Sequence, residues 1–233
     1  MSPLHAASTV AGEPLAVGPF SQIQVSGHAE VVLVQGDRET VTVEGSSNDP
    51  AHIRVRSNNG RLRIDAESDH GWFSLSGRVP TITVHFRKLD ALGMSGTVKV
   101  SAAAIDTPTL KVSAAGAASL KIDQLKTSEL RFTGAGAAKS EIGGSATTQQ
   151  IVISGVGSYR AAKLVSDSVK AIVSGAGRVV VNAQKDLSAT ISGAGAIDYL
   201  GDPAVKQRIS GAGKITRRSA EAIPTQRRTQ FVA

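Results

Sequence analysis

Serine and glycine are the residues that most suggest chemistry in this chain, because they recur together in six short boxes of small residues. A nucleophilic serine occurs once in an enzyme, and many hydrolases carry it in a Gly-x-Ser-x-Gly turn, which is absent here. These serines instead occupy one position of successive copies, so we predict a structural role and no catalytic residue. The boxes are Ser113–Gly116, Thr133–Gly136, Ser154–Gly157, Ser174–Gly177, Ser192–Gly195 and Ser210–Gly213.

The glycines of the boxes do not form a nucleotide site. Gly211–Lys214 is similar to part of a phosphate-binding loop, but that loop requires glycine where Arg208 stands and Ser or Thr where Ile215 stands. A dinucleotide fingerprint also fails, because each box lies between two predicted strands and does not open a helix.

Metal ligands are scattered along the chain. Calcium-binding β-rolls require Gly-Gly-x-Gly-x-Asp, whereas the acids Asp123, Glu141 and Asp198 follow no such spacing. All five histidines lie within the first 85 residues, the last being His85, and none of them has the spacing of a metal site. We therefore expect neither a metal nor another cofactor.

One dense charged cluster surrounds a predicted hairpin. Some parallel β-helices cleave acidic polysaccharides with clustered carboxylates and an arginine on one face, so a polysaccharide-active enzyme is one alternative. The alternating pattern places these side chains on the outer faces of two strands, where cross-strand ion pairs explain them. The cluster consists of Arg54, Arg56, Arg61, Arg63, Asp65, Glu67 and Asp69.

The aromatic pair Trp72 and Phe73 has two interpretations. An exposed tryptophan can stack on a sugar ring or fill a pocket of a partner. The pair can also plug an open end of the fold, which is the interpretation that we favour. We retain both residues as candidate surface contacts.

The spacing of the boxes predicts the elements that carry them. The boxes return at nearly even intervals, and a repeat of about 20 residues is typical of one coil of a solenoid. Such a unit buries its apolar face only when stacked coils align equivalent residues in columns. Glycine allows a positive φ at a corner and leaves room for the next copy. We assign these structural turns to the last glycine of each box: Gly116, Gly136, Gly157, Gly177, Gly195 and Gly213.

The segment before Leu92 is less regular, but its pattern also predicts strands. Ile53–Arg56 and Leu62–Asp65 flank Asn59-Gly60, a strong hairpin signal. No helical periodicity occurs, so we predict an all-β fold, a β-solenoid with coils of about 20 residues and an irregular N-terminal cap. The expected organisation is a leader (1–18), cap and first coils (19–90), regular coils of the same domain (91–218) and a disordered basic tail (219–233).

Composition and charge narrow the function. The 233-residue chain has no cysteine, which excludes disulfides and thiolate metal sites. The net charge is +7, of which +6 lies after residue 205, so the body is nearly neutral and we expect no specific nucleic-acid partner. No stretch approaches the roughly 18 apolar residues of a membrane helix. Pro3–Ser8 resembles the end of a signal peptide, and we expect an export signal that is missing or truncated in this chain.

Outside the boxes, a series of short segments follows a recognisable order. The segments are Phe20-x-x-Ile23-x-Val25-Ser26-Gly27, Val31-x-Leu33-x-Gln35-Gly36, Val41-x-Val43-Glu44-Gly45, Leu62-x-Ile64, Ile82-x-Val84, Leu89 and Met94-Ser95-Gly96, and the boxes come after them. Over roughly residues 18–218 this order resembles a bacterial family, the "putative auto-transporter adhesin, head GIN domain" proteins. The resemblance implies a right-handed parallel β-helix that is usually exported, often carries a signal peptide or lipid anchor and has no established activity.

We therefore expect a non-catalytic, adhesin-like binding or structural protein of the periplasm or cell surface. Its partner would be an unidentified envelope protein or glycan, and it could also self-associate through the faces or ends of the β-helix. An intracellular scaffold that polymerises end to end is a second alternative, beside the enzyme considered above.

Overall fold

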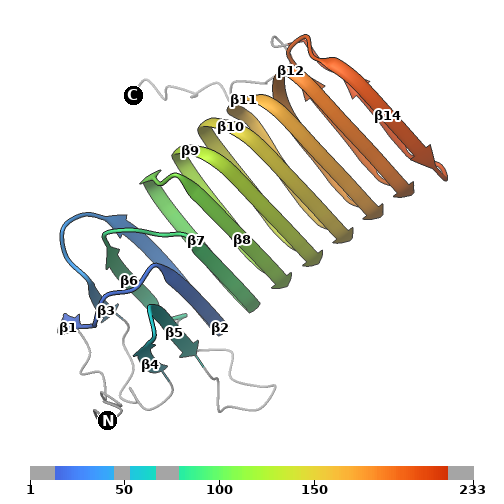
Figure 1. The fold of residues 1–233 in the computed structure, drawn as a ribbon. Coiled ribbons are helices and arrows are strands. Elements are labelled where there is room, and N and C mark those ends of the chain that lie inside the picture. Colours follow the sequence, from blue (N-terminus) through green and yellow to red (C-terminus); the bar gives the residue numbers. More distant parts are fainter. Residues whose placement is uncertain (1–13, 45–52, 67–78, 220–233) are drawn as a thin grey trace, which may run out of the picture.

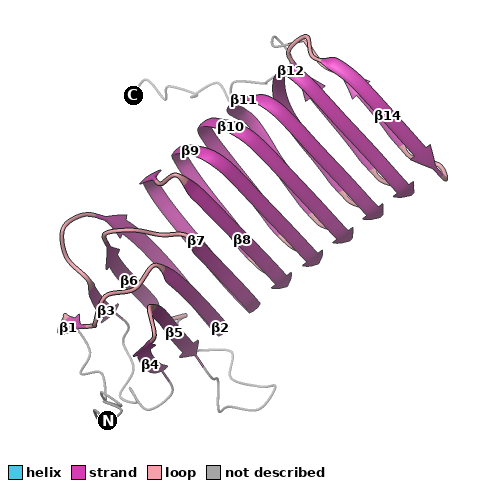
Figure 2. Ribbon diagram, in the orientation of Figure 1, coloured by secondary structure: helices cyan, strands magenta, loops and turns pink. Residues whose placement is uncertain are grey.

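The computed structural model describes residues 14–44, 53–66 and 79–219. In this part of the chain every regular element is a strand, and the strands form a β-solenoid of about six turns with coils of roughly 20 residues (Figures 1 and 2). The all-β solenoid predicted from the boxes is thereby confirmed.

The N-terminal part builds the first rung of the solenoid and two extensions of it. β2 pairs in parallel with β7 over twelve positions, so it already belongs to the stack. β4 and β5 form the predicted hairpin, in which Asn59 and Gly60 adopt positive φ angles of 50° and 74°. These strands are β1 (Leu15–Ala16), β2 (Gln22–Gln35), β3 (Thr40–Glu44), β4 (Ile53–Asn58), β5 (Arg61–Ala66) and β6 (Thr81–Phe86).

The regular coils follow, and most of their strands bend around a corner. The first part of β9 pairs with β7 and the second part with β8, so one long strand contributes to two sides of the rod. The strands are β7 (Ala91–Asp106), β8 (Thr109–Gly116), β9 (Ser119–Gly136), β10 (Lys139–Gly155), β11 (Ser158–Gly175), β12 (Arg178–Gly193), β13 (Ala196–Leu200), β14 (Ala204–Ser210) and β15 (Lys214–Arg217).

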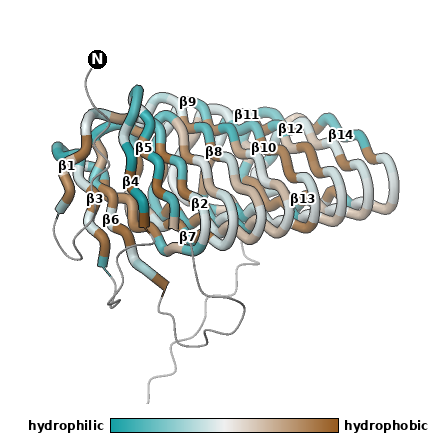
Figure 3. The backbone as a smooth tube through the Cα atoms, turned by 90° about the horizontal axis from the view of Figure 1, so that it is seen from below, coloured by the Kyte–Doolittle hydropathy of each residue, from teal (hydrophilic) through white to brown (hydrophobic). Residues whose placement is uncertain are grey.

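Alternation of side chains separates a dry interior from the outer faces. Because successive residues of a strand point to opposite sides, every second position of each coil enters the core. Parallel pairing then stacks equivalent residues, and brown and teal segments alternate along the tube in Figure 3. One buried column contains Leu92, Val112, Phe132, Ile151, Ala171 and Ala189.

Large and small core residues compensate for each other between coils. The rings of Phe132 and Tyr159 lie 5.0 Å apart at 53°. Tyr159 stacks on Ser140, the residue of its own column one coil earlier, where a larger side chain would compete for space.

A chain of hydrogen bonds also runs through the core. The buried Tyr159 hydroxyl donates to Gln149 Oε1 at 2.8 Å, and Gln149 Nε2 donates to Ser166 Oγ at 2.6 Å. This polar chain satisfies three buried groups inside the rod.

One corner of every coil is a glycine with a positive φ. Gly175, for example, has φ +115°, and a Cβ at this position would lie 2.6 Å from the carbonyl oxygen of Gly155 one coil earlier. That carbonyl accepts the backbone N–H of Ala176 at 3.0 Å, so it is fixed in place. The glycine column consists of Gly27, Gly96, Gly116, Gly136, Gly155, Gly175, Gly193 and Gly211.

The six glycines assigned from sequence fall into two columns. Gly116 and Gly136 belong to the glycine column and have φ +79°. In the other four boxes the positive φ lies at the second residue, such as Gly155, which corrects the assignment to the last one. Those last glycines follow two residues later and pack against side chains: a Cβ on Gly177 would meet Ile153 Cγ2 at 2.7 Å. The four glycines whose assignment was wrong, because they have no positive φ, are Gly157, Gly177, Gly195 and Gly213.

Candidate functional site

One lateral face of the solenoid combines nine strands into a continuous surface. Its order is β5-β2-β7-β8-β9-β10-β11-β12-β14, so residues far apart in sequence lie side by side. Two outward columns cross it. The first contains Arg61, Gln22, Ala91, Lys111, Arg131, Gln150, Lys170, Ser188 and Lys206. The second contains Arg63, Gln24, Gly93, Ser113, Thr133, Val152, Ile172, Thr190 and Arg208.

We call these two columns the basic face, because their charges are of one sign. Among their eighteen positions, all within the described residues, seven side chains are cationic and none is a carboxylate. All seven are exposed. Like charges along one surface add to a positive potential that attracts anions. The seven are Arg61, Arg63, Lys111, Arg131, Lys170, Lys206 and Arg208.

Carboxylates occur beside the basic face and on the other faces, where many have a cationic partner. Glu30 contacts Lys99 at 3.0 Å, and Asp167 contacts Lys185 at 2.9 Å. Beside the basic face, Glu129 contacts Arg131 at 2.6 Å and partly offsets its charge. The other faces are therefore mixed in sign.

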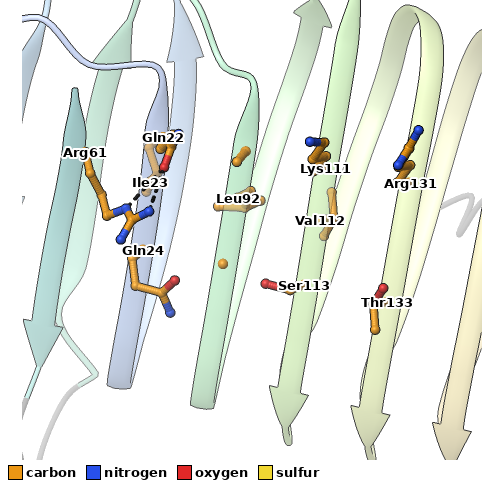
Figure 4. A pocket seen from close by; sticks show the side chains of 12 residues that line it. Gln22, Ile23, Gln24, Arg61, Leu92, Lys111, Val112, Ser113, Arg131 and Thr133 are labelled. Carbon is orange, nitrogen blue, oxygen red and sulfur yellow. Dashed lines mark hydrogen bonds between the residues drawn. The ribbon is translucent and has the colours of Figure 1, made fainter. Parts of the chain in front are cut away.

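The basic face is hollowed near its N-terminal end. A groove of about 430 Å³ crosses β5, β2, β7, β8 and β9, and Figure 4 shows the side chains around it. Its floor lies at Gly93, which is buried and has no side chain in the second outward column. A Cβ there would meet Gln24 Oε1 at 2.1 Å, so the glycine lets the Gln24 amide lie across the column.

Polar groups line this groove at several depths. Arg61 donates from Nε and Nη2 to Gln22 Oε1 at 3.1 and 3.0 Å, which orients the guanidinium across two strands (Figure 4). Ser113 and Thr133 contribute hydroxyls. Lys111 and Arg131 lie on adjacent strands along one side. The groove thus offers cations, amides and hydroxyls together, a set suited to hydrogen bonding with a polar, anionic ligand.

A second groove, of about 540 Å³, lies over other parts of the coils and has a mixed character. Asp106 and Lys126 form an ion pair of 3.1 Å there, and Asp123 pairs with Lys121 at the same distance. Because its charges already compensate each other, this groove attracts neither sign of ligand strongly.

Several residues singled out from sequence fall outside the described residues. Trp72, Phe73, Glu67 and Asp69 belong to this group, so their roles stay predictions. Asp65 lies opposite Arg54 in the hairpin and accepts the Ser26 hydroxyl from the neighbouring strand β2, while the cross-strand ion pairs stay a prediction. In the described part of the chain, no three His, Cys, Asp or Glu residues gather where they could hold a metal ion.

Sequence reasoning missed the basic face. Arg61 and Arg63 were recognised as a local cluster, but their continuation to Lys111 and Arg131 requires the pairing of β2 with both β5 and β7. Equal offsets from the column glycines, such as Lys170 five before Gly175 and Lys206 five before Gly211, were an available signal. These offsets are equal only when they are counted from the glycines with a positive φ, and the assignment of the turns to the last glycine of each box concealed them.

The strands, the columns and the lateral groove define a β-solenoid with a repeated basic surface. The family model described as "Putative auto-transporter adhesin, head GIN domain" matches residues 19–203, and the chain belongs to this family. The resemblance recognised from sequence is thereby confirmed. No curated protein matches the chain.

Solved structures share the fold. A putative adhesin from Bacteroides fragilis is 21% identical with a TM-score of 0.83, over 91% of this chain and 99% of that one. A putative adhesin from Parabacteroides merdae is 19% identical with a TM-score of 0.69, over 89% and 95%. A putative lipid binding protein from Parabacteroides distasonis is 17% identical with a TM-score of 0.67, over 90% and 99%. At these identities the likeness concerns the fold.

Proposed function

We propose that this protein is a non-catalytic, exported or envelope-associated binding protein that holds an extended partner along the side of its solenoid. The observation that carries the proposal is the basic face, where two outward columns repeat polar groups over nine strands. At about 4.8 Å per strand, the eight steps between them span about 38 Å. A repeated surface of this length suits a partner that is itself repetitive and extended.

Membership of the adhesin-named family supports the same proposal. The repeated serines support a non-catalytic role, because they stack at one position of successive coils: Ser154, Ser174 and Ser192 follow one another in register. The described residues contain no helix able to cross a membrane.

Localisation tests this proposal first. The protein would be tagged at its chromosomal locus, the cells fractionated, and protease accessibility compared before and after opening of the envelope. We expect recovery in the periplasm or at the surface. Protection within the cytosol, in cells whose periplasmic and cytosolic markers separate cleanly, would contradict the export and support the intracellular scaffold.

A further inference from the structure

We propose that the basic face binds an acidic polysaccharide that carries one anionic group per disaccharide and lies along the solenoid axis. The inference rests on the proposed binding function and names the chemistry of its partner. Its first support is the sign of the charge, with seven exposed cations and no carboxylate in the two columns. A neutral glycan would gain no attraction from these charges.

The spacing of the cations is the second support. In the first column Arg131, Lys170 and Lys206 recur on every second strand, with Gln150 and Ser188 between them. Two strands correspond to about 9.6 Å along the axis, about the length of an extended disaccharide. An anionic group on alternate sugars therefore meets a cation at each repeat.

The neutral positions beside the cations supply the third support. Gln22, Gln24, Ser113 and Thr133 present amides and hydroxyls, which donate to and accept from sugar hydroxyls. The groove of about 430 Å³ lies over these positions, and the Gln24 amide, which occupies the space above Gly93, is one of the groups that a sugar ring can meet there. The basic face thus combines cations with neutral hydrogen-bonding groups, as an acidic polysaccharide combines anionic groups with hydroxyls.

Other polyanions fit this surface less well. Single-stranded nucleic acids bind through aromatic side chains on which bases stack, and neither column contains an aromatic residue in the described part of the chain. Peripheral membrane binding uses large apolar side chains beside the cations. In the two columns the apolar side chains are those of Ala91, which is small, and of the adjacent residues Val152 and Ile172. This apolar area is small for a surface that inserts into a membrane.

The test uses the purified full chain and immobilised hyaluronan, whose carboxylate recurs once per disaccharide, with interferometry as the readout. Carboxyl-reduced hyaluronan is the matched neutral polymer, and polyglutamate and anionic phospholipid vesicles represent other classes of polyanion. We expect saturable binding to hyaluronan alone. Because the contacts are exposed ion pairs, we expect the affinity to fall by about tenfold or more between about 50 and about 200 mM salt.

Two matched triple variants distinguish binding by the basic face from attraction by the net charge of the protein. The triple substitution Lys111→Gln, Lys170→Gln and Lys206→Gln removes three cations from the first column. The control triple, Lys139→Gln, Lys163→Gln and Lys214→Gln, removes three exposed cations from other faces. We expect the first triple to weaken hyaluronan binding by about tenfold or more and the control by less than about twofold. Circular dichroism and thermal melting show whether both triples keep the fold.

Each other outcome overturns the inference. Equal losses in the two triples would mean attraction by net charge alone. Equal binding of the carboxyl-reduced polymer would mean that the anion is not recognised, and tighter binding of polyglutamate or vesicles would point to another class of partner. If the triple fails to fold, the salt dependence and the reduced polymer still decide with the unaltered chain. A failed binding test beside a periplasmic or surface location would overturn the polysaccharide and leave the proposed function standing.

Discussion

At the scale of single residues, the glycine column leaves no room for even one methyl group. Gly175→Ala would place an alanine at φ +115° with its Cβ 2.6 Å from the Gly155 carbonyl oxygen. The left-handed conformation alone costs about 1–2 kcal/mol, and the contact adds to it. We expect the free energy of unfolding to fall by about 2–3 kcal/mol in a denaturant titration.

Gly36→Ala is the control for this prediction. Gly36 has no positive φ and no heavy atom within 4 Å of the added Cβ, so its unfolding free energy should stay within about 0.5 kcal/mol of the unaltered chain. Equal stability of the Gly175→Ala and Gly36→Ala variants would show that the coils can spread, contrary to the fixed spacing described here.

A second residue-scale prediction concerns the polar chain in the core. Tyr159→Phe removes the hydroxyl that donates to Gln149 Oε1 and leaves this buried oxygen without its partner. An unsatisfied buried acceptor costs about 1–3 kcal/mol, and we expect that loss in the free energy of unfolding. Tyr199→Phe, at a partly buried ring packed on the edge of the core, should cost less than about 0.5 kcal/mol.

The same tyrosine predicts a dependence on pH. Burial raises the pKa of Tyr159 in the folded state, so the unfolded chain, with a tyrosine pKa near 10, loses this proton first. The stability contribution is fully present below about pH 10 and declines above it, by up to about 1.4 kcal/mol per pH unit. We expect Tyr159→Phe to remove this decline, measured as the difference between the two proteins so that lysine titration cancels. An unchanged difference between about pH 10 and about pH 11 would contradict it.

At the scale of elements, β14 is an open edge. Among the described strands it pairs with β12 alone, and all seven of its residues are exposed, including Val205 and Ile209. Open edges recruit other strands unless charged residues interrupt them. In β14 the charged residues are Lys206 and Arg208. If two copies paired along this edge, their like charges would lie directly opposite each other and destabilise the pairing.

Removing these charges should therefore release self-association. We expect the double variant Lys206→Val, Arg208→Val to form dimers or larger species in light scattering at concentrations where the unaltered chain is monomeric. Lys170→Val alters the same outward column on an inner strand, whose edges are already paired, and should stay monomeric. A monomeric double variant would show that something other than charge protects this edge.

The elements were predictable from sequence to the extent that local signals define them. The box period predicted the solenoid, and Asn59-Gly60 predicted the β4–β5 hairpin, because a turn of this kind depends on neighbouring residues alone. The position of the positive φ was misassigned in four boxes, since boxes with two glycines, such as Gly155 and Gly157, do not show which one meets the carbonyl of the previous coil. That distinction depends on register between coils.

At the scale of the whole molecule, the basic face depends on pairing that no single segment encodes. β2 lies between β5 and β7, so Arg61 and Lys111 share one surface although they belong to distant parts of the sequence. The buried chain of Tyr159, Gln149 and Ser166 is likewise a product of stacking. The repeat period of the sequence is enough to identify the solenoid. The charge pattern across the coils can be worked out only from the register in which each coil pairs with the next.

The pairing of β2 with β7 also has a consequence for the order in which the protein assembles. Gly27 and Gly96 are neighbours in the column although β3 to β6 lie between them in sequence, whereas Gly96 and Gly116 are a single coil apart. Closing the longer loop costs about 1 kcal/mol more, and contacts between distant residues form more slowly. We expect pulse-labelling hydrogen exchange during refolding to protect β8–β11 before β2, and simultaneous protection would contradict this order. During synthesis β2 can pair with β7 only after β3 to β6 have been made, so the first rung of the rod waits longer for its neighbour in the stack than the regular coils do.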